Sequence, residues 1–298
     1  MHVAQFEDRS GPLVGIRTGK RWINYGKAER VMYMLRHGVV AAGTDTVADL
    51  LARGQFDVEL FGEVLGFIAR ERLERFVTVA PEARMTAPLR SPGKIIALGL
   101  NYALHAREGK MPLPKEPMIF VKAPSAIIGP GETVRIPHGM GRMDHEVELA
   151  VVIGKRAAGV SEKSAWDHIA GYTILNDVTA RDIQTLDVGK KHPWFRSKSF
   201  DSFCPLGPWI VTADEFRPPV HVDLECRVNG RIRQKANTKN LVFGIAKIIS
   251  WVSRLIALEP GDIISTGTPE GISPVTDGDV ITCRIRGIGE LRNPVRWR

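Results

Sequence analysis

The sequence predicts an α+β chain that is mostly β, with a small N-terminal α/β domain over residues 1–85 and a larger domain over residues 86–298. The first 80 residues read as short strands followed by helices. From Lys94 onward, short apolar runs alternate with Gly/Pro turns, which is typical of a β-rich domain. The segment between these two parts, PEARMTAPLRSPGK, is rich in proline and polar residues, which indicates a linker.

Helices are predicted from apolar spacing and from start and stop signals. They cover residues 44–54, 57–76, 161–169, a stretch after Asp177, and 240–258. The predicted strands of the larger domain are KIIALGL, PMIFVKA, VELAVVIG, GYTILND, GPWIVT, DLECRVNG, GDIISTGT and DVITCRIRG.

Composition bounds the class of protein. The chain has 298 residues, of which 44% are hydrophobic and 25% charged, so it can bury a sizeable core. No apolar stretch is long and uncharged enough for a membrane helix, and the N-terminus does not resemble a signal peptide. The three cysteines are scattered and form no CxxC motif. We therefore expect a cytoplasmic protein with reduced thiols and no membrane partner.

The formal charge of +8 raises the question of nucleic-acid binding. The basic residues are spread out, with the densest patches at 227–239 and 284–298, and no recognition motif accompanies them. A solvated basic surface is the simpler interpretation, and it would also attract small anions. We therefore expect no nucleic-acid partner.

The segment DHEVELAVVIGK, residues 144–155, places Glu146 and Glu148 at the head of an apolar strand. Alternate residues of a strand point the same way. One face carries Val147, Leu149, Val151 and Ile153, and the other carries Glu146, Glu148, Ala150 and Val152. Both faces therefore look buried, and two buried charges need a partner or a metal ion. On this reading His145 points away from Glu146 and is a poor ligand candidate.

Asp177 ends the predicted strand GYTILND. Taken alone, it would most simply cap the following helix. Together with Glu146 and Glu148, however, it completes a set of three carboxylates without a cysteine or histidine cluster. Such hard oxygen ligands suit Mg²⁺ or Mn²⁺, with Ca²⁺ as a further candidate, rather than zinc.

Three other features carry groups that could do chemistry. His105 and Glu108 are three residues apart, so on a helical turn their side chains meet as a base and its carboxylate, or as an inconsequential surface pair. Lys198 could offset substrate charge, although by itself it reads as a surface lysine. The turn STGTPEG, residues 265–271, places Thr268 where backbone N–H groups could cradle a carboxylate.

A set of motifs together resembles the fumarylacetoacetate hydrolase family from about residue 91 to the C-terminus. The motifs are GLNYALHAREG, FVKAPSAIIGPG, DHEVELAVVIGK, GYTILNDVTARDIQ, PWFRSKSFDSFCPLGPW, LEPGDIISTGTPEGI and GIGELRNPV. The resemblance implies a mixed β-sandwich or roll around a divalent metal, and it points to the smaller acylpyruvase-like and isomerase-like members. Where many relatives have an aspartate before the lid histidine, this chain has Leu104.

The resemblance also implies roles for individual residues. Glu146, Glu148 and Asp177 would bind the metal, and His105 with Glu108 would activate water. Lys198 would face the developing negative charge of the substrate. Three further residues would border the substrate: Arg181, Gln184 and Thr268. A homodimer is the usual assembly of such relatives.

The resemblance implies a metal-stabilised enolate but does not fix the overall reaction. Because the His105–Glu108 pair could activate water, we first expect hydrolysis of a C–C bond in a 2,4-dioxo acid, giving pyruvate and a second acid. The substrate would be a small anionic 2-oxo acid. The same site would also serve an isomerase or a decarboxylase of a related oxo-dicarboxylate, which stays as the alternative. A metal-binding protein without catalysis is a third hypothesis, which would hold if the His105–Glu108 pair lay away from the metal site.

Overall fold

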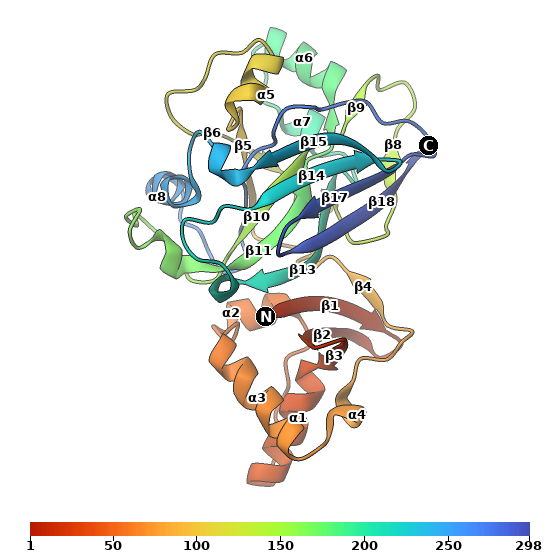
Figure 1. Ribbon diagram of the computed structural model, residues 1–298, viewed down its shortest axis with the longest axis vertical. Coiled ribbons are helices and arrows are strands. Elements are labelled where there is room, and N and C mark those ends of the chain that lie inside the picture. Colours follow the sequence, from red (N-terminus) through yellow and green to blue (C-terminus); the bar gives the residue numbers. More distant parts are fainter.

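The computed structural model describes all 298 residues and contains two large sheets with helices at their ends (Figure 1). The larger sheet has 11 strands, of which nine follow the order β3-β2-β1-β13-β11-β10-β16-β5-β6. The second sheet has five strands in the order β15-β14-β17-β18-β8. This architecture confirms the α+β, mostly β prediction. None of the helices has the length and apolar character needed to cross a lipid bilayer.

The N-terminal part forms a β-hairpin, a third strand and two main helices. Its elements are β1 (His2–Asp8), β2 (Gly11–Thr18), β3 (Arg21–Asn24), α1 (Tyr25–His37), α2 (Val47–Ala52), α3 (Val58–Arg70), α4 (Glu74–Val77) and β4 (Arg84–Thr86). The side chains of Asn24, Thr46 and Asp57 cap the first turns of α1, α2 and α3. The expected domain boundary near residue 85 stays a prediction, and β1 pairs directly with β13 of the larger domain.

The single helix predicted over residues 57–76 is wrong, because the structure has two helices there. α3 ends at Arg70, and α4 begins at Glu74. Between them Arg72 has a φ of 58°, which a continuing right-handed helix does not allow. The apolar spacing continues across the break and therefore does not reveal it.

The strands that carry the candidate site form a contiguous part of the larger sheet, from β13 to the terminal strand β6. They are β5 (Ile95–Gly99), β6 (Met118–Lys122), β10 (Val147–Ile153), β11 (Ile169–Asn176), β13 (Cys204–Thr212) and β16 (Ile263–Ser265). All seven residues of β10 are buried, as the alternation analysis predicts. Its odd-numbered residues pack in the core beneath the second sheet, whereas Ala150 and Val152 pack in a second core that reaches the N-terminal helices. Neither face of β10 is therefore exposed to solvent.

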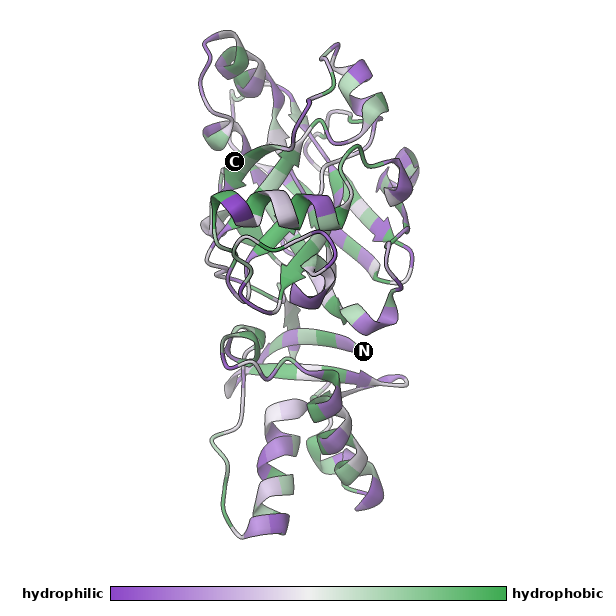
Figure 2. Cartoon of the chain, turned by 90° about the vertical axis from the view of Figure 1, so that its left-hand side faces the viewer, coloured by the Kyte–Doolittle hydropathy of each residue, from purple (hydrophilic) through white to green (hydrophobic).

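The second sheet covers the first and completes the sandwich. Its strands are β14 (Asp223–Val228), β15 (Arg231–Asn237), β17 (Val280–Ile285), β18 (Gly289–Trp297) and β8 (Val134–Ile136). Three short strands complete the set: β7 (Ile127–Ile128), β9 (Met143–Asp144) and β12 (Thr179–Ala180). Hydrophobic residues run along the strands of both sheets, whereas the helices carry hydrophilic residues on their outer sides (Figure 2).

Three short helices, α5 (Ala103–Glu108), α6 (Arg181–Gly189) and α7 (Phe195–Lys198), gather at the end of the sandwich opposite α1 and α3 (Figure 1). α8 (Ile245–Leu255) lies within the helix predicted over 240–258. The helix predicted over 161–169 is wrong, since only a 3₁₀ turn, Ala165–His168, forms there. The site described next lies at the end of the sandwich that α5, α6 and α7 cover.

Candidate active site

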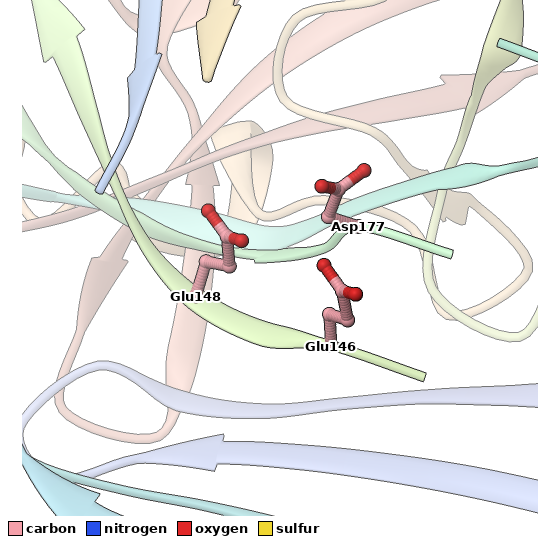
Figure 3. Close-up of side chains that lie close together, drawn as sticks. All are labelled: Glu146, Glu148 and Asp177. Atoms are coloured by element: carbon pink, nitrogen blue, oxygen red, sulfur yellow. The ribbon is translucent and has the colours of Figure 1, made fainter. Parts of the chain in front are cut away.

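Three buried carboxylates converge at the ends of two neighbouring strands (Figure 3). Glu148 lies in β10, Glu146 directly precedes this strand, and Asp177 directly follows β11. Because β10 and β11 pair antiparallel with Val147 opposite Asn176, Asp177 comes to lie beside the two glutamates. One oxygen from each carboxylate lies within 4.8 Å of the others. Glu146 and Glu148, which alternate along one strand, and Asp177, at the end of its neighbour, therefore form a single acidic triad.

Backbone and hydroxyl donors fix the Glu148 carboxylate. Its Oε2 accepts hydrogen bonds from Ser265 Oγ at 2.6 Å and from the Gly267 N–H at 2.8 Å. Gly267 has a φ of 95°, and a Cβ there would lie 2.9 Å from the Asn101 Cβ, so the turn requires glycine. The turn over residues 265–271 thus cradles a carboxylate, as expected, but this carboxylate belongs to the protein.

The pKa values of Glu146 and Glu148 are shifted in opposite directions. The Lys198 ammonium donates to Glu146 Oε2 at 2.7 Å and to Asp177 Oδ2, and the Arg181 guanidinium also donates to Glu146. Burial alone would raise the pKa of Glu146, but these two cations hold it well below its usual range. In contrast, burial and the negative charges of Asp177 and Glu146 raise the pKa of Glu148 to about 8.

The triad fits a divalent cation. It offers three hard oxygen ligands, and both hydrogen bonds to Glu148 go to Oε2, which leaves Oε1 for a metal ion. The raised pKa of Glu148 reflects its burial and the like charges of Asp177 and Glu146, which a cation would neutralise. Glu146, Glu148 and Asp177 are therefore the residues that would hold such an ion.

A histidine–carboxylate pair on helix α5 faces the triad. The Nδ1 atom of His105 lies 3.3 Å from Glu108 Oε2. Glu108 also accepts hydrogen bonds from the Gly271 N–H, at 3.2 and 3.3 Å to its two oxygens. Since the carboxylate only accepts, Nδ1 carries the proton and Nε2 is the basic nitrogen. The pair is thus built as a base with an orienting partner.

A cavity of about 270 Å³ connects the pair to the triad. It is lined by seven of the nine expected site residues: His105, Glu146, Glu148, Arg181, Gln184, Lys198 and Thr268. The two others, Glu108 and Asp177, hydrogen-bond to His105 and Lys198. Apolar residues, among them Phe120 and Trp194, also line the cavity, and the Phe120 ring centroid lies 5.1 Å from Lys198 Nζ. One pocket therefore brings together the groups that the sequence singles out.

Two simpler interpretations from the sequence are wrong. Lys198 is not a surface residue, because its side chain is only 3% exposed and bridges two carboxylates. Asp177 does not cap the following helix: α6 has Ala180 at its N-cap, without a side-chain capping bond. Both residues serve the acidic triad.

Two further residues of the site escape the sequence analysis. Asp144 is fully buried and accepts from the Nε atoms of Arg142 and Arg181, each at 2.7 Å, so it orients the Arg181 guanidinium. Lys122, at the end of β6, donates to Asp177 Oδ1 at 2.6 Å. Asp144 stands in the same short motif as Glu146, but nothing in its spacing points to Arg181. Lys122 ends an apolar run, which is the only signal that could have found it.

A family model describing the C-terminal part of fumarylacetoacetate (FAA) hydrolase matches residues 94–296. The chain belongs to the fumarylacetoacetate hydrolase family. This family assignment confirms the resemblance seen in the sequence motifs.

Named relatives and solved structures extend the comparison. A mitochondrial oxaloacetate tautomerase of Xenopus laevis is 44% identical over 218 residues, which are 71% of this chain and 68% of that protein. The fumarylacetoacetate hydrolase of Exiguobacterium antarcticum aligns along the whole of both chains with a TM-score of 0.81 and 34% identity.

A third similar protein, the maleylpyruvate hydrolase of Sphingobium sp. SYK-6, was solved with a manganese(II) ion and pyruvate. It has a TM-score of 0.75 and 32% identity, and the match covers 100% of this chain and 99% of that one. The family thus contains hydrolases and a tautomerase, and one similar structure holds a divalent metal.

Proposed function

We propose that the protein is a divalent-metal-dependent enzyme that moves a proton at C3 of a small anionic 2-oxo acid, with oxaloacetate as the first substrate to test. One observation carries the proposal: a single pocket is lined by Glu146 and Glu148 of the acidic triad and by His105, the base of the His105–Glu108 pair. Mg²⁺ and Mn²⁺ are the metals that suit its ligands, with Ca²⁺ as a third candidate. A metal-binding protein without catalysis would have no use for an oriented base in the same cavity.

Glu146, Glu148 and Asp177 would hold the ion, which supplies a Lewis acid for the oxygens of the 2-oxo acid. Arg181 and Gln184 hydrogen-bond to each other, and both line the pocket beside Glu146. We propose that they border the substrate together with Thr268. Apolar residues of the lining, among them Phe120 and Trp194, would limit the access of water to the reacting carbon.

His105 is the proposed base. In the keto-to-enol direction, Nε2 takes the proton from C3, and the electron pair of the C3–H bond forms the C2–C3 double bond. The C2 oxygen gains the charge and then a proton, which gives the enol. Glu108 fixes the imidazole in the tautomer that leaves Nε2 free, because its carboxylate accepts from Nδ1. Such general-base catalysis typically contributes about 10² to 10⁴-fold to the rate.

Lys198 is proposed to stabilise the charge that develops on the C2 oxygen. Burial would lower the pKa of Lys198, but Asp177 and Glu146 raise it above its usual value, so the side chain is a buried ammonium. A preorganised cation in a dry pocket stabilises a developing negative charge more strongly than a solvated one.

The relatives support enolisation as the first reaction to test. The Xenopus laevis tautomerase shares 44% identity, whereas the maleylpyruvate hydrolase shares 32%. Proton transfer at C3 also requires no water in the pocket, which agrees with the apolar residues of its lining.

Hydrolysis of a C–C bond in a 2,4-dioxo acid, expected first from the sequence, is the second candidate. It is favoured by the same histidine, which could take a proton from a water molecule attacking the C4 carbonyl. The C3–C4 bond would then break and release pyruvate and a second acid. Decarboxylation of oxaloacetate belongs to the same group of reactions, because it also passes through an enolate.

A side-by-side assay separates these reactions. The protein, with Mg²⁺ or Mn²⁺, is given oxaloacetate and an acylpyruvate, and the enol, the released pyruvate and the carbon dioxide are measured. Buffer with metal alone is the control. We expect faster keto–enol exchange of oxaloacetate, abolished by a chelator. Release of pyruvate from the acylpyruvate without faster exchange would replace enolisation by hydrolysis as the function.

The assembly and location of the protein are proposals as well. We expect a homodimer, as the resemblance implies, and light scattering would measure its mass. The cytoplasmic location expected from the cysteines stays a prediction, since the Xenopus laevis relative is mitochondrial. Fractionation of the native cells would test it.

A further inference from the structure

Gln234 is the one buried residue of β15, whose other residues are exposed or half-buried. Its carboxamide makes four hydrogen bonds. Oε1 accepts from the Val147 N–H at 3.1 Å and pairs with His145 Nδ1 at 3.0 Å. Nε2 donates to Thr268 Oγ1 and to the Pro269 carbonyl, each at 2.8 Å. The backbone donor on one side and the backbone acceptor on the other fix the orientation of the amide.

These bonds join two parts of the active site that are far apart in the sequence. Val147 lies between the two glutamates of the triad, at the start of β10. Thr268 and Pro269 belong to the loop that follows β16, residues 266–273, which we call the latch loop. Gln234 therefore connects the latch loop with the strand that carries the triad.

The latch loop holds the segment of residues 101–113 that contains α5, which we call the lid. The N–H of Gly271 donates to both carboxylate oxygens of Glu108, and Glu108 pairs with His105. Gly271 has a φ of 93°, and a Cβ there would lie 2.1 Å from the carbonyl oxygen of Arg233, the residue before Gln234. Gly271, whose N–H binds Glu108, therefore packs directly against β15.

His145 braces the same loop at its far end. Its Nε2 lies 2.9 Å from the hydroxyl of Ser273, while its Nδ1 faces Gln234. Since Oε1 of Gln234 only accepts, Nδ1 carries the proton, and Nε2 accepts from Ser273. Gln234 and His145 together hold the latch loop at residues 268, 269 and 273.

We propose that Gln234 is a positioning residue: through the latch loop it places Gly271 so that Glu108, and with it His105, stays over the acidic triad. This inference rests on the proposed role of His105 as the base. Gln234 itself touches neither the triad carboxylates nor the base, so its effect on the reaction passes through the loop.

The first test compares Gln234→Met, a substitution of similar length without hydrogen bonds, with Lys235→Ala, its exposed neighbour on β15. We expect Gln234→Met to lower kcat by about 10 to 10²-fold, because small displacements of a catalytic group have effects of this order. Its affinity for Mn²⁺ should stay within about twofold of the wild type, and Lys235→Ala should match the wild type. A parallel loss of Mn²⁺ affinity would place the effect on the triad and overturn the proposal.

A double-mutant cycle with Glu108→Gln tests the route of the effect. If Gln234 acts through Glu108, Gln234→Met should lower kcat by less than about threefold once Glu108 is already replaced. Effects of the two substitutions that multiply would overturn the proposal. Ser273→Ala, which removes only the outer brace, provides a milder variant with a smaller loss of kcat should Gln234→Met fail to fold.

Hydrogen exchange gives a readout that needs no turnover. In the metal-loaded protein, the amide of Gly271 and the lid segment 101–113 should exchange faster in Gln234→Met than in the wild type, while β10 and β11 stay protected. Unchanged exchange of the lid and loop would overturn the proposal. Failure of the proposed function would be recognised separately, as absence of turnover of every 2-oxo acid by the wild type despite normal lid protection.

Discussion

The two ends of the pocket differ in their support. The acidic end, with the triad, lies on buried strands of the sheet, whereas the lid end, with His105 and Glu108, lies on a six-residue helix at the surface. Glu146, Glu148 and Asp177 are each at most 3% exposed and have charged or hydrogen-bonding partners from α7 and β16. The Glu108 side chain is 34% exposed, and it is held by one backbone N–H and one histidine. A cation site needs rigid, dry ligands, whereas a base that acts on an entering substrate needs a support that can open. The predictions below test this division of roles.

The largest effect is expected at the rigid end. Glu148→Ala and Asp177→Ala should each reduce turnover to the level of buffer with metal, because each removes a ligand of the cation. Calorimetric titration with Mn²⁺ should show weakened binding in both. Glu290→Ala, an exposed carboxylate of β18, is the control and should behave as the wild type. Wild-type Mn²⁺ affinity in either triad variant would show that the ligands are assigned wrongly.

The next largest effect is expected at the lid. His105→Ala should lower both enolisation and any acylpyruvate cleavage by about 10² to 10⁴-fold, the usual contribution of a general base. Decarboxylation of oxaloacetate releases carbon dioxide rather than a C3 proton, so it should fall less. All three activities are measured in the same preparation with saturating Mg²⁺. Wild-type rates in this variant would show that His105 is not the base.

Lys198 lies at the acidic end, where it is hydrogen-bonded to two of the three carboxylates. Lys198→Met should lower kcat by about 10²-fold, as for the loss of one preorganised electrostatic group. Affinity for Mn²⁺ should be kept or increased, because the ammonium that bridges Glu146 and Asp177 is removed. Steady-state kinetics and metal titration of one sample provide both values. Unchanged kcat would mean that Lys198 serves only to balance the charge of the triad.

The smallest effect concerns pH. In the metal-free protein the pKa of Glu148 is raised to about 8, so between its ordinary value and 8 the folded state binds one proton more than the unfolded state. The free energy of unfolding should therefore decrease as the pH rises towards 8, and Mg²⁺ should remove this loss by replacing the proton.

Melting temperatures of the wild type and of Glu148→Gln, with and without Mg²⁺, check this pH dependence. Without metal, the difference in melting temperature between the wild type and Glu148→Gln should vary with pH, since the glutamine does not titrate. The apparent Mn²⁺ affinity of the wild type should rise by up to about tenfold per pH unit below pH 8. A metal affinity independent of pH from 6 to 8 would contradict the raised pKa.

Local sequence patterns were enough to predict the acidic triad. Glu146 and Glu148 were found because they alternate on a strand with two apolar faces, and Asp177 because it ends the neighbouring strand. The His105–Glu108 pair followed from helical spacing. These features depend on residues close in the sequence, where strand and helix periods apply.

Residues that depend on long-range pairing could not be found in the same way. Lys122 meets Asp177 across 55 positions, and Gln234 meets Val147 across 87. Their partners follow from the order of strands in the sheets, which no local pattern contains. The break between α3 and α4 was missed for another reason, since residues 71–73 do not interrupt the apolar spacing of the helix.

The most direct test of the account is a crystal grown with Mn²⁺ and pyruvate and measured at the manganese absorption edge. We expect one anomalous peak per chain at the acidic triad, within coordination distance of Glu146, Glu148 and Asp177, with pyruvate on the side of the pocket that His105 faces. No peak at the triad, or a peak held by other residues, would contradict it.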